Sequence, residues 1–446
     1  MFKSISKRSL FLILCDLCSV YAAYVLACSI KSAELQIVQK DIPVFIAIAF
    51  FVIPVIFYIF DLYYPFKHFK KIQTLVDVGV AVLVSFLILA SISYLDRTLL
   101  LARSLFIPTA LLLIPLAVMS RLLYDVIFRF RFLDKRVFVL GSGTLAKEIV
   151  EAIKATPHSG LEVVGFLEEK EGKMIDLDSL APVIGQMKDL MSLIDWHNID
   201  MLILALDPKE KLSEAHILAS LISKKVSVTS ALHLYEQIKG EIPYKILDDH
   251  YLLNLMSRVK YYPYLKLKRV IDILFSLLLL LVFLPILILA IMVLFIDDPR
   301  NVFFVQKRVG LNGKTFKLIK LRTMTNFSHK TQVVTRLGKI LRRYRIDEFP
   351  QLLNVLKGDM SLIGPRPEML YFVERSRNNI PFYDSVLAIK PGLTGWAQVN
   401  LNHVTSLSDY EQKFKLNLYY LKNVSLTLDL VILLRTIRVI LFGTGK

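Results

Sequence analysis

The sequence has few cysteines and few charged residues for its length. Only three of its 446 residues are cysteines, Cys15, Cys18 and Cys28, and all lie in the first apolar segment. This clustering argues against a disulfide framework, and the first pair lacks the second pair or nearby histidine that a zinc site needs. Charged residues make up 21% of the chain and hydrophobic residues 55%. With a mean hydropathy of +0.53, the composition indicates a membrane protein.

Acidic residues are missing from one long stretch. From Arg300 to Arg345 the sequence has thirteen Lys or Arg residues and no Asp or Glu, and the adjacent acids Asp347 and Glu348 follow directly. Such a positive field lowers carboxylate pKa values and attracts anions. The net charge of +17 is also typical of nucleic acid binding, but in a membrane protein basic residues gather beside anionic headgroups. We therefore expect a lipid bilayer as partner and no nucleic acid.

Four apolar segments of spanning length, 9–30, 42–62, 73–95 and 104–128, predict a transmembrane helix bundle over residues 1–130. Basic residues precede the first segment, separate the second from the third and follow the fourth, so both ends of the bundle should face the cytoplasm. Asp16 lies inside the first segment. A hydrogen bond within the bundle is the preferred interpretation of this acid, and a proton relay is the alternative.

An α/β module is predicted over residues 131–260. The stretch "RVFVLGSGTLAKEIVEAI" reads as a strand, a glycine turn and an amphipathic helix, and "LEVVGFLEE" and "IDMLILAL" read as further strands. Gly141, Gly143 and Ala146 form a GxGxxA-like turn of the kind that holds a pyrophosphate at a helix N-terminus. The same glycines make any tight strand-to-helix turn, and no ribose-binding acid is evident. A structural or regulatory module is therefore preferred, and a dinucleotide site stays open.

A second long apolar run, residues 273–296, contains Pro285 and no charge. It is long enough to span a bilayer, but crossing would place the basic stretch outside. The C-terminal apolar run carries Asp429 and looks like an interfacial amphipathic helix rather than a return span. We therefore predict a re-entrant helical hairpin near residues 266–297, bent at Pro285. Its entry should be anchored by Lys266, Lys268 and Arg269, and its exit by Asp297, Asp298 and Arg300. A fifth span is the alternative.

Three motifs carry the chemistry: "RVGLNGKTFKLIKLRTM", "DEFPQLLNVLKGDMSLIGPRPE" and "KPGLTGWAQVN". The first predicts two strands, on which Lys320 and Arg322 could share a face that binds phosphate or headgroups. In the second, Pro350 begins a helix that Gly358 ends, with Asp347 and Glu348 at its N-terminus. Capping would explain one acid. Two acids among arginines suggest a nucleophile and a ligand for a hard cation, which divide the tasks of phosphoryl transfer.

These motifs resemble the bacterial polyprenyl-phosphate hexose-1-phosphate transferases over residues 262–446, and the preceding regions resemble the long branch of that family. The resemblance implies a fold of three parts: an integral membrane α-helical bundle, an α/β Rossmann-like module, and a monotopic α/β catalytic domain with a re-entrant helix over residues 261–446. It also implies Mg²⁺ as cofactor, a UDP-sugar donor and undecaprenyl phosphate as acceptor. The location would be the bacterial inner membrane, with the catalytic domain on its cytoplasmic face.

The resemblance also suggests residue roles. Asp347 would be the nucleophile and Glu348 a metal ligand. Phosphate or nucleotide contacts would come from Lys320, Arg322, Arg342, Arg366 and Glu368. Many relatives have Thr-Ser-Leu where this chain has Tyr344, Arg345 and Ile346, and a Leu where it has Phe349.

No motif specifies the sugar, for which galactose and glucose are the family-weighted expectations. The pathway is not specified either, and a homodimer is possible. Two other classes stay open: a membrane-anchored regulator that senses a nucleotide without turnover, and a transporter built on the bundle, although the sequence shows no evident polar pathway.

Overall fold

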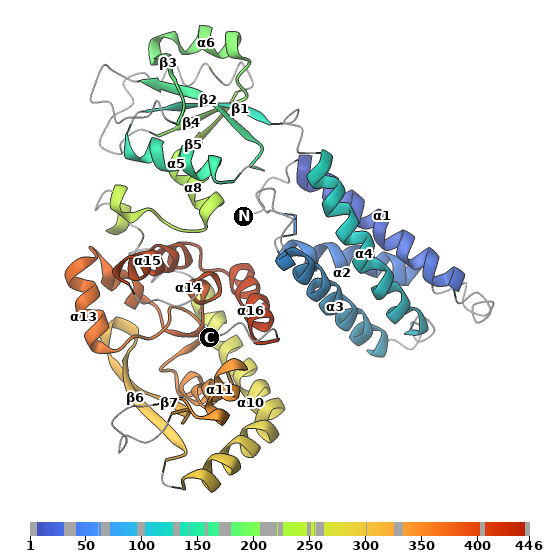
Figure 1. Cartoon of the computed structure of the whole chain (residues 1–446), viewed down its shortest axis with the longest axis vertical. Coiled ribbons are helices and arrows are strands. Elements are labelled where there is room, and N and C mark those ends of the chain that lie inside the picture. The colour runs from blue at the N-terminus through green and yellow to red at the C-terminus, as the bar shows by residue number, and fades with distance from the viewer. Residues whose placement is uncertain are drawn as a thin grey trace. The chain divides into compact units, whose positions relative to one another are not determined.

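The computed structural model describes residues 7–30, 42–60, 62–63, 72–95, 103–127, 134–141, 143–156, 159–168, 180–205, 221, 226–247, 251–253, 255, 263–299, 301–324, 333–401 and 406–441. The chain divides into two compact units, residues 1–238 and 239–446. The first unit contains a helix bundle and an α/β domain (Figure 1).

The bundle consists of α1 (Lys7–Ile30), α2 (Ile42–Ile59), α3 (Ile72–Leu95) and α4 (Arg103–Ile127). These bounds confirm the four predicted helices. Within the described residues α1, α3 and α4 are each long and apolar enough to cross a membrane, whereas the described apolar part of α2 is shorter. Large apolar side chains such as Leu14, Leu87 and Leu111 are exposed on the bundle, as expected for helices surrounded by lipid.

Asp16 forms a buried ion pair inside the bundle. Both of its carboxylate oxygens accept hydrogen bonds from the guanidinium of Arg121 on α4, which also lies over the ring of Phe57 on α2 at 5.1 Å. Both charged side chains are almost fully buried. This contact agrees with the preferred interpretation of Asp16 as a bundle-facing polar residue and identifies Arg121 as its partner.

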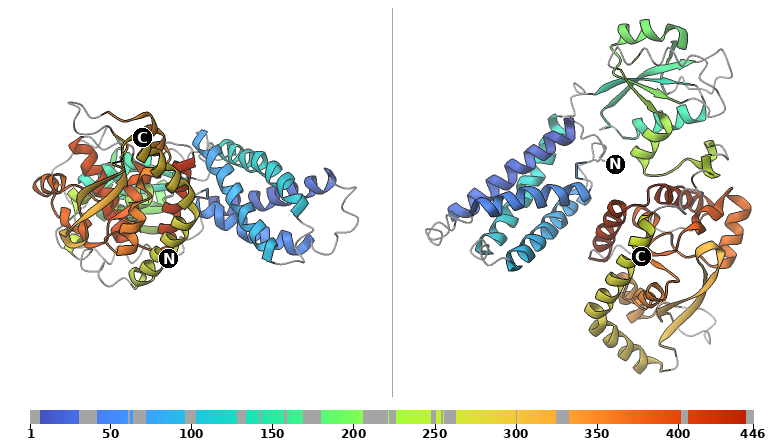
Figure 2. Two further views of the ribbon diagram at one scale, coloured as in Figure 1. Left: turned by 90° about the horizontal axis from the view of Figure 1, so that it is seen from below. Right: turned by 180° about the vertical axis from the view of Figure 1, so that it is seen from behind.

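The α/β domain is a five-stranded parallel sheet with the order β3-β2-β1-β4-β5. Its elements are β1 (Lys135–Leu140), α5 (Thr144–Lys154), β2 (Leu161–Glu168), β3 (Val183–Gln186), a 3₁₀ turn (Met187–Asp189), α6 (Leu190–His197), β4 (Met201–Leu204), β5 (Ser227–Ser230) and α8 (Ala231–Lys239). Helices α5 and α6 lie on opposite faces of the sheet (Figures 1 and 2). This arrangement confirms the predicted Rossmann-like module.

The second unit packs short strands and helices around a large hydrophobic core and a smaller cluster beside α10. Its elements are a 3₁₀ turn (Tyr244–Ile246), α10 (Tyr264–Asp297), β6 (Phe303–Val309), β7 (Thr315–Leu321), α11 (Arg336–Arg343), a 3₁₀ turn (Ile346–Glu348), α12 (Gln351–Lys357), β8 (Ser361–Ile363), α13 (Leu370–Asn379), a 3₁₀ segment (Tyr383–Ala388), β9 (Gly392–Thr394), α14 (Trp396–Asn400), α15 (Leu407–Lys422) and α16 (Leu426–Leu441). A further 3₁₀ turn joins the antiparallel strands β6 and β7 at Leu311–Gly313.

The domain boundary differs from the prediction of 260/261. The second unit begins at Lys239, and Ile242 and Leu252 belong to its hydrophobic core. The indole of Trp396 donates a hydrogen bond to the carbonyl of Gly240 at 2.8 Å. The segment therefore packs with the C-terminal unit because its apolar side chains are buried there, which a search for strand and helix periods does not detect.

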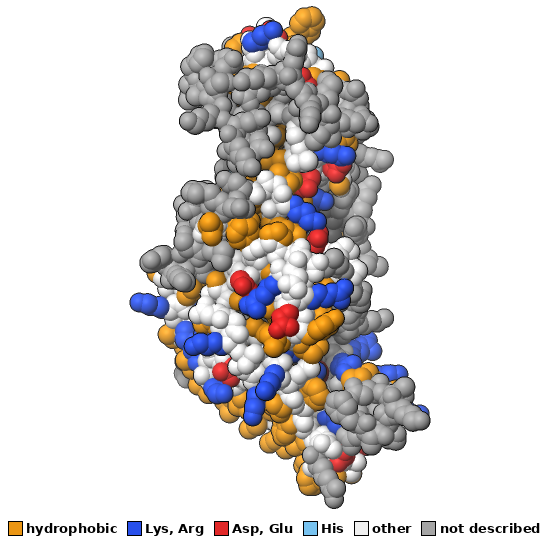
Figure 3. Space-filling view, turned by 90° about the vertical axis from the view of Figure 1, so that its left-hand side faces the viewer, with side chains coloured by type: hydrophobic (Ala, Val, Ile, Leu, Met, Phe, Trp, Pro, Cys, Tyr) orange, Lys and Arg blue, Asp and Glu red, His pale blue; other side chains and the backbone are white. Residues whose placement is uncertain are grey.

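Helix α10 is a single helix of 34 residues with Pro285 inside it. The chain therefore does not form two separate helices at the proline, as a hairpin would require. Instead the helix bends along its length, as Figures 1 and 2 show, which is the usual effect of a proline within a helix. Most of its apolar surface is exposed, with Ile296 82% exposed. Figure 3 shows hydrophobic side chains gathered toward the lower end of this unit.

Both ends of α10 are bound to the same compact unit. Near its start, Arg269 donates to the carbonyls of Val355 and Leu356 at 2.6 and 2.8 Å. At its end, Asp297 and Asp298 pair with Arg322 at 2.5 and 2.9 Å. A straight helix of this length would separate its ends by about 50 Å. A helix that crossed a bilayer could not keep both ends in contact with one compact unit, so the contacts favour re-entry over a fifth span.

The charged residues near the start of α10 bind protein groups, in contrast to the lipid-anchoring role predicted for Lys268 and Arg269. Lys268 forms a buried ion pair with Asp429 of α16. Asp429 also accepts hydrogen bonds from the hydroxyls of Tyr264 and Tyr420 at 2.8 and 2.7 Å. Asp429 therefore fixes α16 to α10 and is not part of a solvated helix face. Arg300, predicted at the exit, lies outside the described residues.

The contacts of α10 make a prediction about topology. Lys266→Cys and Lys314→Cys, each in a chain with the three native cysteines replaced by serine, should both be labelled in intact cells only by a membrane-permeant maleimide. Both side chains are exposed in the structure, so access to the reagent depends on the side of the membrane. Thr98→Cys, between the third and fourth predicted spans, is the control that an impermeant reagent should label. Labelling of Lys314→Cys alone by the impermeant reagent would show that α10 crosses the membrane.

Candidate active site

Asp347 and Glu348 lie in the 3₁₀ turn that leads into α12. As predicted, α12 follows Pro350 and ends at Gly358, whose φ of +96° is readily adopted only by glycine. The two acids are 6% and 9% exposed. Arg345 precedes the turn with φ +57°, an uncommon conformation for a residue with a side chain. This backbone directs both carboxylates into the unit beside β7.

Two arginines hold the carboxylate of Glu348. Arg366 donates to its Oε1 at 3.1 Å and Arg345 at 3.3 Å. Burial would raise the pKa of Glu348, but the charges of Arg366 and Arg345 outweigh burial and hold this pKa below its usual range. Glu348 is therefore ionised at neutral pH. Arg345, one of the departures from the family pattern, is thus part of the charge arrangement around the two acids.

Asp347 has the opposite shift. Burial raises its pKa to about 6, the charge of Glu348 adds to the rise, and Lys320, Arg342 and Arg345 reduce it. The sequence suggested that the surrounding bases would depress both pKa values. For Asp347 this expectation is wrong because the loss of hydration outweighs the attraction of the cations. Asp347 is still about ten to one ionised at pH 7.

Three of the predicted basic residues surround the acids. Lys320 on β7 and Arg342 on α11 both interact electrostatically with Asp347, and Arg366 binds Glu348. Burial lowers the pKa of Lys320, and the charge of Asp347 offsets part of that effect. Arg342 is oriented by a hydrogen bond of 2.9 Å from its Nε to the hydroxyl of Thr323. The cations therefore come from three separate elements.

Arg322 and Glu368 are placed differently from the other predicted contacts. Both carboxylates at the end of α10 pair with Arg322, so this side chain ties β7 to the long helix. Glu368 pairs with Lys413 of α15 and lies 3.9 Å from Arg308. Arg366, which binds Glu348, also interacts electrostatically with Glu368, and Arg308 lines the same cavity as Glu348.

A cavity with about 330 Å³ of empty space lies beside Glu348. It is lined by Arg308, Leu318, Lys320, Glu348, Gln351, Arg366, Pro367 and Gly392. Sequence reasoning did not single out Arg308 or Gln351. Phe304, Gln306 and Arg308 on β6 are half-buried and alternate with three exposed residues. This alternation is the signal that could have identified Arg308.

Close backbone packing positions Arg366 at this cavity. Strand β8 pairs in parallel with β9, and Arg366 follows β8 in the loop. A Cβ added at Gly392 would stand 2.0 Å from the backbone nitrogen of Gly364, so only glycine permits this approach. The glycines of "IGPRP" and "KPGLTGW" therefore bring the two motifs into contact.

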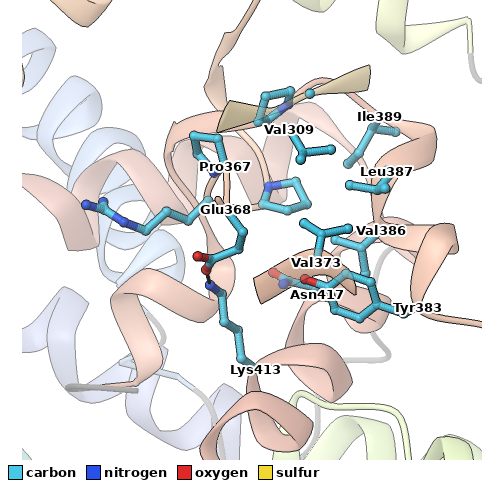
Figure 4. Close-up of a pocket in the computed structure, with 14 residues that line it drawn as sticks. Val309, Pro367, Glu368, Val373, Tyr383, Val386, Leu387, Ile389, Lys413 and Asn417 are labelled. Carbon is cyan, nitrogen blue, oxygen red and sulfur yellow. Dashed lines mark hydrogen bonds and ion pairs between the residues drawn. The ribbon is translucent and has the colours of Figure 1, made fainter. Parts of the chain in front are cut away.

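A second cavity, with about 360 Å³ of empty space, adjoins the first and shares Arg366 and Pro367 with it. Figure 4 shows the carboxylate of Glu368 directed toward Lys413 on one side of the cavity. Tyr383, Val386 and Leu387 lie on the other side. The lining therefore combines a largely apolar wall with one ion pair. Such a surface suits a flat, partly polar group.

The residue after the two acids contacts the long apolar helix. The rings of Phe349 and Phe283 of α10 are 4.8 Å apart between centroids. This Phe-for-Leu departure from the family pattern therefore adds an aromatic contact between the site and α10.

Two family models match the chain. The model described as bacterial sugar transferase matches residues 263–443, and the model described as CoA-binding domain matches residues 58–231. The first range contains every residue of the site described above. The second covers the α/β sheet as far as α8, together with the third and fourth helices of the bundle.

Several curated proteins are similar to the chain. An N-acetylgalactosaminephosphotransferase of Aeromonas hydrophila, named for UDP-N-acetylgalactosamine and undecaprenyl phosphate, is 39% identical over 220 residues, which are 47% of this chain and 52% of the relative. A UDP-glucose:undecaprenyl-phosphate glucose-1-phosphate transferase of Klebsiella pneumoniae is 29% identical over 329 residues, which are 69% of this chain and 68% of the relative. The match thus spans about half of the Aeromonas protein.

The uncharacterized sugar transferase EpsL of Bacillus subtilis is matched over most of its own length by less than half of this chain. It is 40% identical over 190 residues, which are 40% of this chain and 89% of EpsL. The Klebsiella match covers more than the C-terminal unit, since it extends over 69% of this chain. The chain therefore belongs to the bacterial sugar transferase family, and within it to the full-length type, in which membrane helices and a CoA-binding-like domain precede the transferase domain.

Proposed function

We propose that the chain transfers a sugar 1-phosphate from a UDP-sugar to undecaprenyl phosphate and releases UMP. The observation that carries this proposal is the pair of buried carboxylates, Asp347 and Glu348, beside a cavity lined by Arg308, Lys320 and Arg366. Cations in this arrangement suit a diphosphate and the charge that develops when it is cleaved. The names of the Aeromonas and Klebsiella relatives support the same reaction.

The donor lies across the two adjoining cavities. Its diphosphate occupies the basic cavity beside Glu348, and its nucleoside occupies the more apolar cavity that Tyr383 and Glu368 line. Arg366 borders both cavities, so it is placed to bind the phosphate groups between them. The bidentate geometry of a guanidinium suits this position.

Asp347 is the nucleophile of a two-step reaction. In the first step a carboxylate oxygen of Asp347 bonds to the β-phosphorus, and the bond from that phosphorus to the bridging oxygen breaks, so UMP leaves. In the second step a phosphate oxygen of undecaprenyl phosphate bonds to the same phosphorus, and the phosphorus–aspartate bond breaks. The product is a polyprenyl diphosphosugar. One anhydride replaces another, so no other energy source is needed.

The two acids divide the work because their environments differ. Among the described residues no hydrogen bond or ion pair joins Asp347 to an arginine, and its pKa is about 6, which leaves an ionised carboxylate with appreciable basicity. Glu348 is held ionised by Arg366 and Arg345, so its charge is less available for attack on phosphorus. A general-base role for Asp347 is less favourable, because the lipid phosphate is already anionic at neutral pH.

Glu348 and Asp347 also fit a Mg²⁺ site. No cluster of three or more potential ligands occurs among the described residues, but Mg²⁺ is commonly bound by one or two carboxylates together with substrate phosphates and waters. Glu348 would be the principal protein ligand. When bound, Mg²⁺ would neutralise charge on the diphosphate during cleavage.

We place the transferase domain at the cytoplasmic face of the bacterial inner membrane. The exposed apolar surface of α10 enters the lipid from the side on which both helix ends are held. This arrangement brings the site to headgroup level, where the phosphate of a polyprenyl lipid is found. The UDP-sugar arrives from the cytoplasm.

For the sugar we propose galactose or glucose, in line with the resemblance in the sequence and the glucose-specific name of the Klebsiella relative. N-acetylgalactosamine is a further candidate, because the Aeromonas relative, with the higher identity of 39%, is named for that sugar.

A donor panel tests the proposed function. The full chain in nanodiscs is mixed with Mg²⁺, undecaprenyl phosphate and one of UDP-glucose, UDP-galactose or UDP-N-acetylgalactosamine, and UMP is measured. We expect one donor to release UMP in proportion to the lipid phosphate added. No release with any donor, or release that does not depend on the lipid, would favour a regulator or scaffold.

Replacing the nucleophile tests the two-step route. Asp347→Asn keeps the shape of the side chain but removes the attacking charge, so turnover should fall by at least about 10³-fold. With donor labelled in the β-phosphate and no lipid, the wild-type protein should acquire label and release at most one equivalent of UMP. Asp384→Asn, at an exposed carboxylate outside the cavities, is the matched control. A wild-type protein without a burst of UMP would contradict the covalent route.

The pKa of Asp347 predicts the pH dependence of the first step. Because this pKa is raised to about 6, protonation should remove the nucleophile as the pH falls through 6, and the rate of labelling should drop about tenfold per pH unit below it. Because this half-reaction is measured without lipid, ionisation of the lipid phosphate cannot cause the pH dependence. Glu348→Gln removes a negative charge that raises this pKa, so its residual activity should show the acid limb at lower pH. A rate that stays level from pH 8 to pH 5 would contradict the assignment.

A further inference from the structure

The α/β domain has a glycine turn that the transferase reaction does not use. Gly141 ends β1 with φ +116°, and Gly143 is the N-cap of α5, an eleven-residue helix without a side-chain cap. The first N–H groups of α5 are thus free of the side-chain partner that often satisfies helix N-termini. In a parallel sheet with this strand order, ligands bind beyond the carboxyl ends of the strands where the order reverses, which here is between β1 and β4.

Gly143 has no structural reason to be glycine. Its φ is −82°, which any residue adopts, and a Cβ built at this position would meet nothing within 4 Å among the described residues. By contrast, Gly165 in β2 is packed against Ile184. Open space in front of a helix N-terminus is what the close approach of a phosphate requires.

Glu168 provides an independent observation at the same end of the sheet. It is the last residue of β2 and is 8% exposed, and its Oε1 is buried without a hydrogen-bond partner among the described residues. A buried carboxylate oxygen without a partner is costly unless a ligand or water satisfies it. The sequence had not shown an acid for this position.

Strand geometry places Glu168 beside the glycine turn. Leu140 and Leu167 are register partners, and the N–H of Gly141 donates to the carbonyl of Leu167 at 2.8 Å, so Glu168 stands level with Gly141. Leu167 packs in the cluster that contains Leu190 of α6. Because successive side chains alternate between faces, Glu168 points to the opposite face, which α5 covers (Figure 1).

We propose that the α/β domain binds a nucleotide with a diphosphate and a free ribose diol, with the diphosphate at the first turn of α5 and the ribose hydroxyls donating to Glu168. The juxtaposition of Gly143 and Glu168 carries this assignment. Glu168 follows Ala146 by 22 residues, close to the spacing of about 20 between a glycine turn and a ribose-binding acid. A carboxylate at this place repels a phosphorylated ribose. The site therefore disfavours CoA, whose ribose carries a phosphate, although the matching family model is described as a CoA-binding domain.

Calorimetric titration of the full chain in nanodiscs tests this site. The probes are NAD⁺ and UDP-glucose, which have only free ribose diols, and NADP⁺ and CoA, whose adenosine ribose is phosphorylated. We expect at least one free-diol probe to bind the wild-type protein. Its affinity for the Glu168→Gln variant should be at least about tenfold lower. The phosphorylated probes should bind the wild-type protein at least about tenfold more weakly than that probe. UDP-glucose also binds the proposed transferase site, so only the binding that depends on Glu168 is counted.

Two further variants separate a ligand role from a structural one. Gly143→Ser supplies a favourable N-cap residue and meets open space, so the thermal unfolding midpoint should not fall, whereas affinity should drop at least about tenfold because the side chain occupies the phosphate position. Glu151→Gln, at an exposed acid of α5, should change neither quantity. The proposal fails if no probe binds below about 1 mM in a Glu168-dependent manner, if Gly143→Ser leaves affinity unchanged, or if CoA binds as tightly as NAD⁺.

Discussion

The attachment of α10 to the C-terminal unit at both of its ends is the constraint on which the transferase architecture depends. Arg269 fixes the start of the helix to the last carbonyls of α12, and Arg322 fixes its end through Asp297 and Asp298. Between these points the helix contributes Ala290 and Leu294 to a hydrophobic cluster of the unit, and most of its other apolar side chains are exposed. A helix held in this way is part of the compact unit at both of its ends. If α10 lies in the lipid as proposed, the site therefore has a fixed height above the bilayer.

The two acids show how adjacent residues acquire different chemistry. Glu348 and Asp347 share one turn, one positive field and similar burial. Glu348 has two guanidinium partners within 3.3 Å, and their charges outweigh its desolvation. Asp347 interacts with its cations without a hydrogen bond among the described residues and keeps a raised pKa. A carboxylate with direct arginine contacts is a poor nucleophile and a good fixed charge. Direct contact, rather than net local charge, therefore sets the difference between the two pKa values.

Much of this arrangement could be predicted from local patterns, and the rest depends on contacts between distant segments. Hydrophobic length and periodicity gave the membrane helices, the βαβ units and the limits of α12, because each is determined within a short window of sequence. Other features depend on contacts between residues that are far apart in the sequence. They are the boundary near Lys239, the ion pair of Asp16 with Arg121 and the pairing of Arg322 with Asp297. Arg322 looked like a phosphate ligand because a basic residue on a strand gives no sign of which acid will reach it. Glu168 was not recognised because its role depends on strand register and on the face to which it points.

The contact between Phe283 and Phe349 joins the turn of the two acids to the exposed apolar helix α10. Phe349 directly follows the two acids, and its ring packs on a side chain of α10. A thinner bilayer, or one whose lateral pressure tilts α10, would act on this ring first and on the turn of Asp347 and Glu348 one residue later. The positions of the two acids therefore depend on the position of α10 as well as on the rest of the unit. If α10 lies in the lipid as proposed above, the rate of the transfer should respond to the thickness and tension of the bilayer.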